Sequence, residues 1–435
     1  MKKVLLVSYY WPPSAGIAVL RTLKLAKYLR ENGWEPIVYT AENPDYPGID
    51  HSNDKDIPEG ITVIKQPIFE PYKYYRKLMG KQDDANVVNA LVANDDKESL
   101  LHKLSVWVRS NFFIPDARAF WIVRSVNYLT KYLKDNPVDA MWAIGPPHTN
   151  NVIACELKKR LGIPWLADFQ DPWTQVDYFE KLILTSWANR KHHRLEQEVF
   201  EYADHITIVS HQWKKDLQAI GAREVSVIPW GFDHEDYQEL NSTLDQKLTL
   251  LHTGLIGEDR NPATLLQAVR ELLDENDTFK QYFRLKLIGE VDLSVRKVID
   301  ELGLQDWVEV QGNIPRQEVL QKCANAQVLL LLLNQAKNAS GRIPGKLFEY
   351  LGVSRPILCL GDTTGDTANI IREAGAGVTL TYDNKQDIKQ MLLKYLEDFL
   401  KEGKVPHETN QLESLSNRYL TKQVAGILDQ ISGDK

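Results

Sequence analysis

The sequence predicts an α/β protein built from two Rossmann-like domains that face a cleft. Short, almost continuously apolar runs alternate with longer amphipathic segments from end to end, a pattern typical of parallel sheets covered on both faces. These runs are too many for one compact sheet, and a polar, turn-rich stretch at residues 231–247 interrupts them. The length of 435 residues also suits two or three domains.

The expected strands fall into two series, each rich in β-branched residues or leucine. The first series comprises residues 3–9, 36–40, 61–65, 139–144, 164–168, 205–210 and 224–228. The second comprises residues 248–253, 284–288, 307–311, 328–333, 356–360 and 377–380. We therefore assign an N-terminal domain to residues 1–235 and a C-terminal domain to residues 245–411. Residues 412–435 then contain a terminal helix, because their apolar side chains recur at helical spacing.

One stretch, residues 66–118, fits neither series and is expected to be an insertion in the first domain. It mixes aromatic and basic side chains: Tyr72, Lys73, Tyr74, Tyr75, Arg76, Lys77, Trp107, Arg109, Phe112 and Phe113. Such side chains suit weak, reversible attachment to an anionic membrane surface. The alternative is that they pack in the core or cover the cleft.

Composition excludes several classes of protein. A net charge of -7 argues against general binding of nucleic acid. Cys155, Cys323 and Cys359 are odd in number and lack metal-ligand spacing, which indicates buried thiols in a reducing compartment. The longest apolar run, residues 328–333, is far shorter than the roughly 20 residues that span a bilayer. We expect a cytoplasmic protein, at most peripheral to a membrane.

Glycines follow the first strand of each expected domain. Gly16 lies between a strand and a helix, where open α/β sheets bind ligands. In the second domain Gly257 is followed by Arg260 and then by a helix, an arrangement that suits a diphosphate. The alternatives are an ordinary strand-to-helix turn and a solvated loop arginine.

A denser cluster follows the expected strand at residues 328–333. Arg342 precedes a helix start, and Lys346, Leu347 and Glu349 lie in its first turn. Lys346 and Glu349 are three apart and share one helix face, so the lysine can meet a phosphate and the carboxylate a ribose. The alternative is a surface ion pair.

Polar side chains also follow two strands of the first domain. Asp168 and Asp171 end or follow the fifth strand, and His148 follows the fourth. Facing a cleft, these side chains would contact the hydroxyls of a bound ligand and are the candidate catalytic residues. The alternative is an ordinary turn with a structural histidine.

Three segments together resemble the retaining, GT-B-type glycosyltransferases of family 4, and the similarity extends over nearly the whole chain. Residues 228–233, I-P-W-G-F-D, resemble that family's I-P-N-G-V-D, and residues 203–210 resemble its A-D-x-I-x-x-x-S. Residues 344–350 are similar to the P-x-K-L-x-E-Y form of members related to aminosugar transferases of surface-polysaccharide pathways.

The resemblance implies a nucleotide-diphosphate sugar as donor, a sugar or lipid-linked sugar as acceptor, and no further cofactor. The transferred group would be a hexosyl or N-acetylhexosaminyl unit. Glu349 would bind the ribose and Arg260 with Lys346 the diphosphate, while the Gly16 loop closes over donor or acceptor. Related enzymes retain anomeric configuration, and no D-x-D-like pair stands where a metal is expected. The terminal helix would pack back toward the first domain.

Two departures leave alternatives open. Gly341 stands where the family has a first glutamate, and Leu255 where it has an arginine, a charge that Arg342 would have to supply. One alternative is a sugar-nucleotide 2-epimerase, which shares the two-domain architecture. The other is a non-catalytic protein that binds nucleotide sugars.

Overall fold

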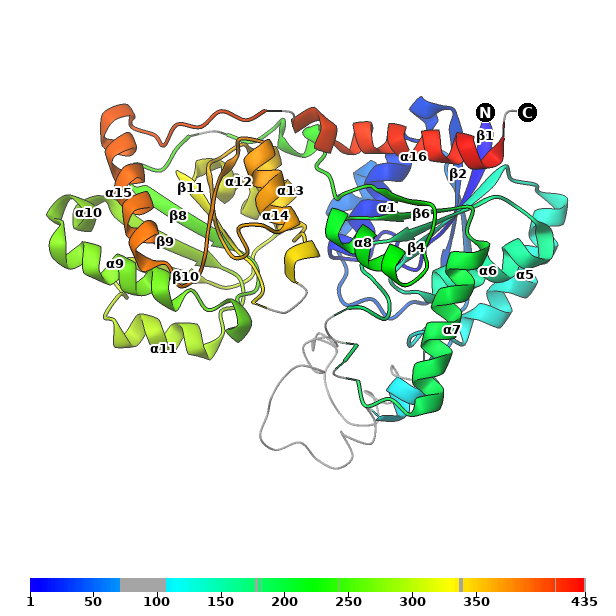
Figure 1. Ribbon diagram of the computed structural model, residues 1–435. Helices are drawn as coiled ribbons and strands as arrows, with labels where there is room; N and C mark the ends of the chain where they lie inside the picture. Colours follow the sequence, from blue (N-terminus) through cyan, green and yellow to red (C-terminus); the bar gives the residue numbers. More distant parts are fainter. Residues whose placement is uncertain are drawn as a thin grey trace. The chain divides into compact units, whose positions relative to one another are not determined.

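The computed structural model describes residues 1–70, 107–176, 179–180, 182–241, 243–335, 339–410 and 412–433. Its contacts divide the chain into two compact units. Unit 1 comprises Met1–Pro229 with Asn417–Lys435, and unit 2 comprises Trp230–Ser416. Figure 1 labels their elements, and each unit is described by itself.

Unit 1 is built on a parallel sheet of seven strands in the order β3-β2-β1-β4-β5-β6-β7. The strands are β1 Lys2–Val7, β2 Trp34–Ala41, β3 Thr62–Gln66, β4 Ala140–Gly145, β5 Trp165–Phe169, β6 His205–Ile208 and β7 Val225–Val227. β1 pairs with β2 on one side and with β4 on the other. The order of the strands therefore reverses between β1 and β4.

The helices of unit 1 begin where polar side chains can take the free backbone N–H groups. Thr185 accepts from the N–H of Ala188 at the start of α7, and Ser210 from that of Trp213 at the start of α8. The helices are α1 Ile17–Tyr28, α5 Trp121–Asp135, α6 Thr149–Leu161, α7 Ser186–Tyr202, α8 His211–Ala219 and α16 Asn417–Ser432, with short η1 Arg30–Asn32 and η2 His51–Asp56.

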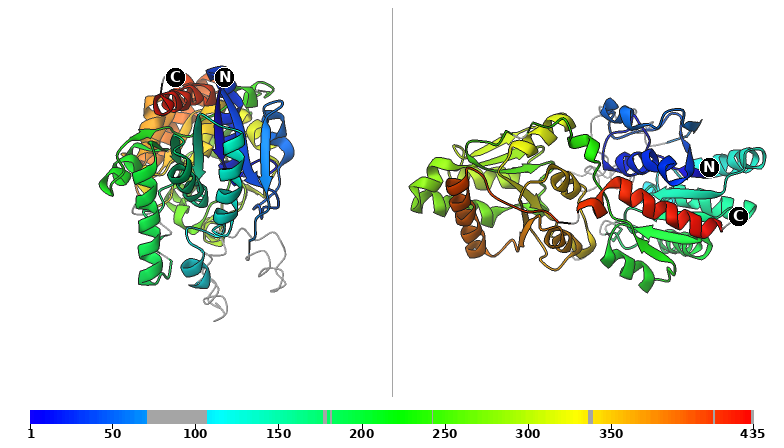
Figure 2. Two further views of the ribbon diagram at one scale, coloured as in Figure 1. Left: turned by 90° about the vertical axis from the view of Figure 1, so that its right-hand side faces the viewer. Right: turned by 90° about the horizontal axis from the view of Figure 1, so that it is seen from above.

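The last helix, α16, belongs to unit 1. It lies along α1 (Figure 2) and buries Leu420, Val424 and Leu428 in the same core as Val4 and Leu6 of β1. It begins at Asn417, five positions later than the start that the apolar spacing suggests, because residues 412–415 form the separate turn η6 Leu412–Leu415.

Unit 2 is built on a parallel sheet of six strands in the order β10-β9-β8-β11-β12-β13. The strands are β8 Leu248–Thr253, β9 Phe283–Ile288, β10 Val308–Gln311, β11 Val328–Leu332, β12 Ile357–Leu360 and β13 Gly377–Leu380. The helices are α9 Ala263–Glu275, α10 Asp277–Tyr282, α11 Leu293–Glu301, α12 Arg316–Asn325, α13 Lys346–Val353, α14 Asp366–Glu373 and α15 Lys385–Glu402, with short η3 His234–Tyr237, η4 Glu258–Arg260 and η5 Ala339–Gly341.

Successive side chains of these strands enter cores on opposite faces of the sheet. Leu250 packs with α9 and α15, whereas Leu251 packs with α13. Both faces are covered, which explains why the strands are almost wholly apolar. The prediction of two Rossmann-like α/β domains is confirmed, and every expected strand lies within two residues of an observed one.

The turn-rich stretch at residues 231–247 is part of unit 2 and not a separate linker. Tyr237 packs against the core around α13, and the Asp245 N–H donates to the Asn325 carbonyl at 2.8 Å. Asp245 also pairs with Lys286 at 2.9 Å. The stretch is polar because it lies on the surface of this unit. The chain first passes from unit 1 to unit 2 after Pro229.

The described helices include none that is both long enough and apolar enough to cross a bilayer. Cys155, Cys323 and Cys359 are free and buried, as expected. Burial raises the pKa of the Cys155 and Cys359 thiols to about 12, so both remain protonated and inert.

Candidate functional site

Each sheet has a point at which its strand order reverses, and open α/β sheets bind ligands outside the carboxyl ends of the strands there. In unit 1 this point lies between β1 and β4, so the loops carrying Gly16 and His148 meet it. In unit 2 it lies between β8 and β11, which brings the Gly257–Arg260 loop together with the loop before α13. The predicted residues thus gather at two sheet edges.

In unit 2 the ammonium of Lys346 lies on the backbone at the end of β8. Nζ donates to the Thr253 carbonyl at 2.7 Å and lies 3.4 Å from Nε2 of His252. Gly254 has φ of 95°, and a Cβ placed there would lie 3.0 Å from Nζ. Burial and the charge of Arg260 lower the pKa of Lys346 to about 8. The lysine is therefore a partly desolvated cation beside a glycine loop.

Arg260 brings a second positive charge to this point. Its side chain is 22% exposed, and Nε lies 3.7 Å from Oδ1 of Asp259 without forming a hydrogen bond in the described chain. Gly257 begins this turn, and a Cβ there would lie 2.8 Å from the same oxygen of Asp259. Two cations beside a small-residue loop favour an anion, because an anion relieves their mutual repulsion.

Glu349, one turn into α13, is held by an arginine that the sequence reading missed. Nε of Arg316 lies 3.0 Å from Oε1 of Glu349, and Nη2 of Arg316 lies 3.2 Å from Oδ2 of Asp236. Arg316 begins α12, 33 residues before Glu349. No local pattern marks it, since its partners come from other elements. The pairing fixes the direction of the Glu349 carboxylate.

Two predicted donor residues have further structural duties. The carbonyl of Arg342 accepts from Oγ1 of Thr367 at 2.8 Å, which anchors the loop before α13. The side chain of Leu347 is fully buried in the unit 2 core beside β11. Leu347 therefore packs α13 onto the sheet, and contact of either residue with a donor stays a prediction.

In unit 1, Gly16 forms the start of α1 with φ of 93°, a conformation that favours glycine. A Cβ at this position would meet nothing within 4 Å, so the backbone angle and not crowding requires the glycine. The preceding loop is tied down, because the N–H of Ala15 donates to the Gly48 carbonyl at 2.9 Å.

Asp168 lies wholly inside unit 1. Arg21 donates to both of its oxygens at 2.8 and 3.0 Å, and Thr207 donates to Oδ1 at 2.7 Å. Arg21 also donates to the carbonyls of Ile228 and Pro229. Through Arg21 and Thr207, the carboxylate thus connects α1, β5, β6 and the residues that follow β7. These contacts give Asp168 a positioning role, and its catalytic role stays a prediction.

His148 lies at the start of α6, buried against an aromatic partner. Its ring stacks on Trp173 with centroids 4.6 Å apart and planes 3° apart. Nε1 of Trp173 donates to Nδ1 of His192 at 3.1 Å, which fixes the indole. Burial lowers the pKa of His148 to about 3 and that of His192 to about 4. Both imidazoles are neutral at neutral pH.

Unpaired polar atoms concentrate around His148. In the described chain, neither ring nitrogen of His148, nor Oδ1 of Asn150, nor either amide atom of Asn151 has a hydrogen-bond partner. Nδ2 of Asn151 and Nδ1 of His148 converge on Gly145, where a Cβ would lie 2.8 and 3.1 Å from them. Buried polar atoms are normally bonded, so this group suits a bound water or hydroxyl. Asp171 follows β5 at the same sheet edge and is half-buried.

Comparison with known proteins agrees with this arrangement. Residues 16–231, just under half of the chain, match the glycosyl transferase 4-like domain family. The chain is 23% identical over 172 residues to the amylovoran biosynthesis glycosyltransferase AmsK of Erwinia amylovora, covering 39% of this chain and 42% of AmsK. It is 24% identical over 226 residues to the putative colanic acid biosynthesis glycosyltransferase WcaL of Salmonella typhimurium, covering 51% of this chain and 52% of WcaL. The matches thus span about half the length of these relatives.

Among solved structures, Anabaena HepE in complex with UDP matches 98% of this chain and 95% of its own, with a TM-score of 0.56 and 13% identity. At that identity the likeness concerns the fold. The matched family domain over residues 16–231, the glycosyltransferase relatives and the two doubly wound sheets together support a family 4 glycosyltransferase of the GT-B fold.

Proposed function

We propose that this protein transfers a sugar from a nucleotide-diphosphate donor to an acceptor hydroxyl in polysaccharide or glycoconjugate biosynthesis. The transferred group is a hexosyl or N-acetylhexosaminyl unit, and its anomeric configuration is retained. The observation that carries the proposal is the convergence of Lys346, Arg260 and the oriented Glu349 on the switch point of unit 2. The names of the relatives, which concern amylovoran and colanic acid, support the class of product.

Binding of the nucleotide-sugar donor needs fixed positive charge for the diphosphate and a hydrogen-bond acceptor for the ribose hydroxyls. Lys346 and Arg260 bind the diphosphate, and Glu349, directed by Arg316, accepts the ribose hydroxyls. As the bond from the sugar's anomeric carbon to the diphosphate breaks, negative charge grows on the leaving oxygen. Cations already in place stabilise that charge, which supports transfer without a metal.

The acceptor end lies at the carboxyl edge of unit 1. An imidazole with a pKa of about 3 is a weak base, so His148 accepts a hydrogen bond from the acceptor hydroxyl instead of removing its proton. Asp171 binds a neighbouring hydroxyl. The acceptor oxygen bonds to the anomeric carbon, and its proton passes to the departing diphosphate.

The decisive experiment measures release of nucleoside diphosphate from a purified sample. A thermal-shift panel of nucleotide sugars first identifies the donor, because a ligand that binds only the native state raises Tm. Release that requires an added sugar or lipid-linked sugar, with transfer to it, supports the proposal. Formation of an epimer without an acceptor product indicates a 2-epimerase, and binding without turnover indicates a non-catalytic protein.

Variants at the ribose site sharpen this experiment. Glu349→Ala should abolish most transfer and weaken donor binding by at least about tenfold, because a carboxylate that pairs hydroxyls is worth about 1.4 kcal/mol or more. Arg316→Gln should give a smaller loss, since the carboxylate remains but is no longer directed. Glu301→Ala, an exposed acid of the same unit, is the control. Normal donor affinity in Glu349→Ala would show that the ribose site lies elsewhere.

A further inference from the structure

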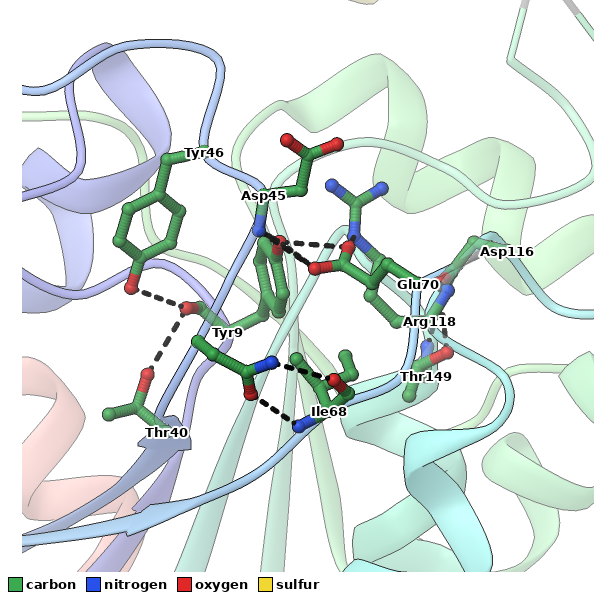
Figure 3. Close-up of polar contacts among 10 residues, drawn as sticks. Tyr9, Thr40, Asp45, Tyr46, Ile68, Glu70, Asp116, Arg118 and Thr149 are labelled. Carbon is green, nitrogen blue, oxygen red and sulfur yellow. Dashed lines mark hydrogen bonds and ion pairs between the residues drawn. The ribbon is translucent and has the colours of Figure 1, made fainter. Parts of the chain in front are cut away.

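A buried ionic cluster lies at the edge of the unit 1 sheet, apart from the residues discussed so far. Tyr9 follows β1, Glu70 follows β3, and Arg118 precedes α5 (Figure 3). The Tyr9 hydroxyl lies 3.0 and 3.1 Å from the two oxygens of Glu70, and the Asp45 N–H donates to Oε2 at 2.8 Å. The Glu70 carboxylate is thereby fixed by its own neighbours.

Arg118 is held beside this carboxylate by an ion pair with Glu70 and by the face of the Tyr9 ring. Its guanidinium carbon lies 4.5 Å from the centroid of the Tyr9 ring, and Nε lies 3.3 Å from Oε1 of Glu70. The side chain is only 17% exposed, and its buried Nε has no hydrogen-bond partner within the described residues. Figure 3 draws no bond from its terminal nitrogens.

This combination is costly unless a ligand completes it. A buried donor left without an acceptor is unfavourable because its lost hydration is not replaced, and more so when the donor is charged. Burial opposes the charge on Arg118, but Tyr10, Tyr9, Glu70 and Asp116 outweigh it and raise the pKa of the guanidinium. Arg118 is therefore a permanent cation with a fixed orientation.

The geometry of the guanidinium selects the ligand. Its terminal nitrogens form a planar fork that matches the paired oxygens of a carboxylate or phosphate. Tyr10 and Tyr46, whose rings stack at 6.2 Å, lie beside Tyr9 and offer an aromatic surface of the kind that sugar rings contact.

We propose that Arg118 binds an anionic group, a carboxylate or a phosphate, on the acceptor. The proposal rests on the proposed glycosyl transfer, because it assigns the anion to the acceptor substrate. Glu70 and Tyr9 are positioning residues that hold the guanidinium in place.

The test titrates the full-length protein with three probes at low ionic strength: glucuronate, glucose 1-phosphate and glucose. Saturating UDP is present throughout, so that the donor site does not compete for phosphate. We expect at least one anionic probe to bind about tenfold more tightly than glucose. A preference for glucuronate alone identifies a carboxylate, and one for glucose 1-phosphate alone identifies a phosphate.

Variants assign the preference to Arg118. Arg118→Gln should abolish it, and Arg118→Lys should retain the charge but reduce the preference, because the fork is lost. Arg124→Gln, which removes an exposed cation of the same unit, is the control. Circular dichroism verifies folding, and if Arg118→Gln is unfolded then Arg118→Lys decides.

Equal binding of all probes by the wild type, or a preference that survives at Arg118→Gln and Arg118→Lys, overturns the proposal. UDP binding is measured in the same samples. Loss of anion preference with intact UDP binding is thus separable from failure of the proposed function, in which no nucleotide binds and no sugar is transferred.

Discussion

At the scale of single residues, the lowered pKa of Lys346 should make donor binding at the proposed site sensitive to pH. The ammonium is protonated below a pKa of about 8, where it attracts a diphosphate, and becomes neutral above it. Affinity for nucleoside diphosphate should therefore be highest below about pH 8 and fall as the pH rises through that value. Titrations between about pH 7 and 9.5 measure the step.

Lys346→Gln should lower the affinity about 10- to 100-fold, the range expected for a charge-assisted hydrogen bond, and remove the step near pH 8. Lys297→Gln, which removes an exposed lysine of α11, should leave both unchanged. Persistence of the step in Lys346→Gln would mean that another group titrates there.

Residue types and their places along the chain were predictable, but their partners were not. Lys346 and Glu349 share a helix face in the sequence pattern, whereas Arg316, which directs Glu349, is 33 residues away on α12. Asp168 stood out after a buried strand, yet Arg21, 147 residues earlier, determines what its carboxylate does. Long-range pairing depends on how the strands are ordered, and that order is not written in local spacing.

At the scale of elements, His148 at the start of α6 should make unit 1 less stable at acid pH. In the unfolded chain His148 takes up a proton near its ordinary pKa of 6.5, whereas in the folded chain burial lowers that pKa to about 3. Between these values the unfolded state binds more protons, so stability falls as the pH drops below about 6.5. The loss at pH 5 is about 2 kcal/mol from this residue.

His148→Phe keeps a ring on Trp173 and removes the titration. Between pH 7.5 and pH 5 the wild type should lose about 2 kcal/mol more of its free energy of unfolding than His148→Phe does. Urea titrations at the two pH values measure this difference. His211→Phe alters an exposed histidine of α8 and should follow the wild type. An unchanged pH dependence in His148→Phe would show that His148 is charged in the folded protein.

The described C-terminal part of the insertion, residues 107–118, contacts the chain just before α7. Residues 107–112 are helical, and Asn111 donates to the Ile183 carbonyl at 2.8 Å and accepts from the Thr185 N–H at 2.6 Å. Figure 1 shows these residues at the end of α7 that is farthest from the sheet of unit 1. Phe112, Ile183 and Trp187 are each more than half exposed here.

This apolar tip sharpens the earlier choice between membrane attachment and core packing. Phe113 does pack, with its ring 5.5 Å from that of Phe120, whereas Phe112 and Trp187 stay more than half exposed. Lys73, Arg76 and Lys77, the cations expected to assist, lie outside the described residues. We propose that the tip enters the interface of an anionic bilayer.

Co-sedimentation with anionic vesicles tests the tip. The wild type should bind weakly and reversibly, and Phe112→Ser with Trp187→Ser should reduce binding severalfold, because less apolar surface leaves water. Leu293→Ser removes an exposed apolar side chain of unit 2 and is the control. Absence of wild-type binding at low ionic strength would contradict membrane attachment and would indicate that these side chains contact a different surface.

At the scale of the whole molecule, the chain folds into two units, each with its own buried side chains, and its last helix completes the first unit. The alternation of apolar runs predicted both sheets, because strands buried on two faces must be apolar throughout. The position at which the chain passes from unit 1 to unit 2, after Pro229, was not predictable from the sequence. The reason is that the polar surface of unit 2 at residues 231–247 resembles a linker in composition. Residues that share a core can thus be far apart in sequence, as Leu6 and Leu428 are in unit 1.

Because each unit has its own core, we expect unfolding in urea to proceed in two steps that respond to different changes. Unit 1 holds the fully buried Trp34, Trp121, Trp142 and Trp165, so tryptophan fluorescence reports mainly on it. Leu428→Ala should lower the stability of that step by about 2–5 kcal/mol, the usual cost of removing a buried leucine side chain. A nucleoside diphosphate that binds unit 2, as proposed, should shift only the other step, followed by circular dichroism. Leu400→Ala, an exposed leucine of α15, is the control. A single step, shifted equally by Leu428→Ala and by nucleotide, would show that the two cores unfold as one.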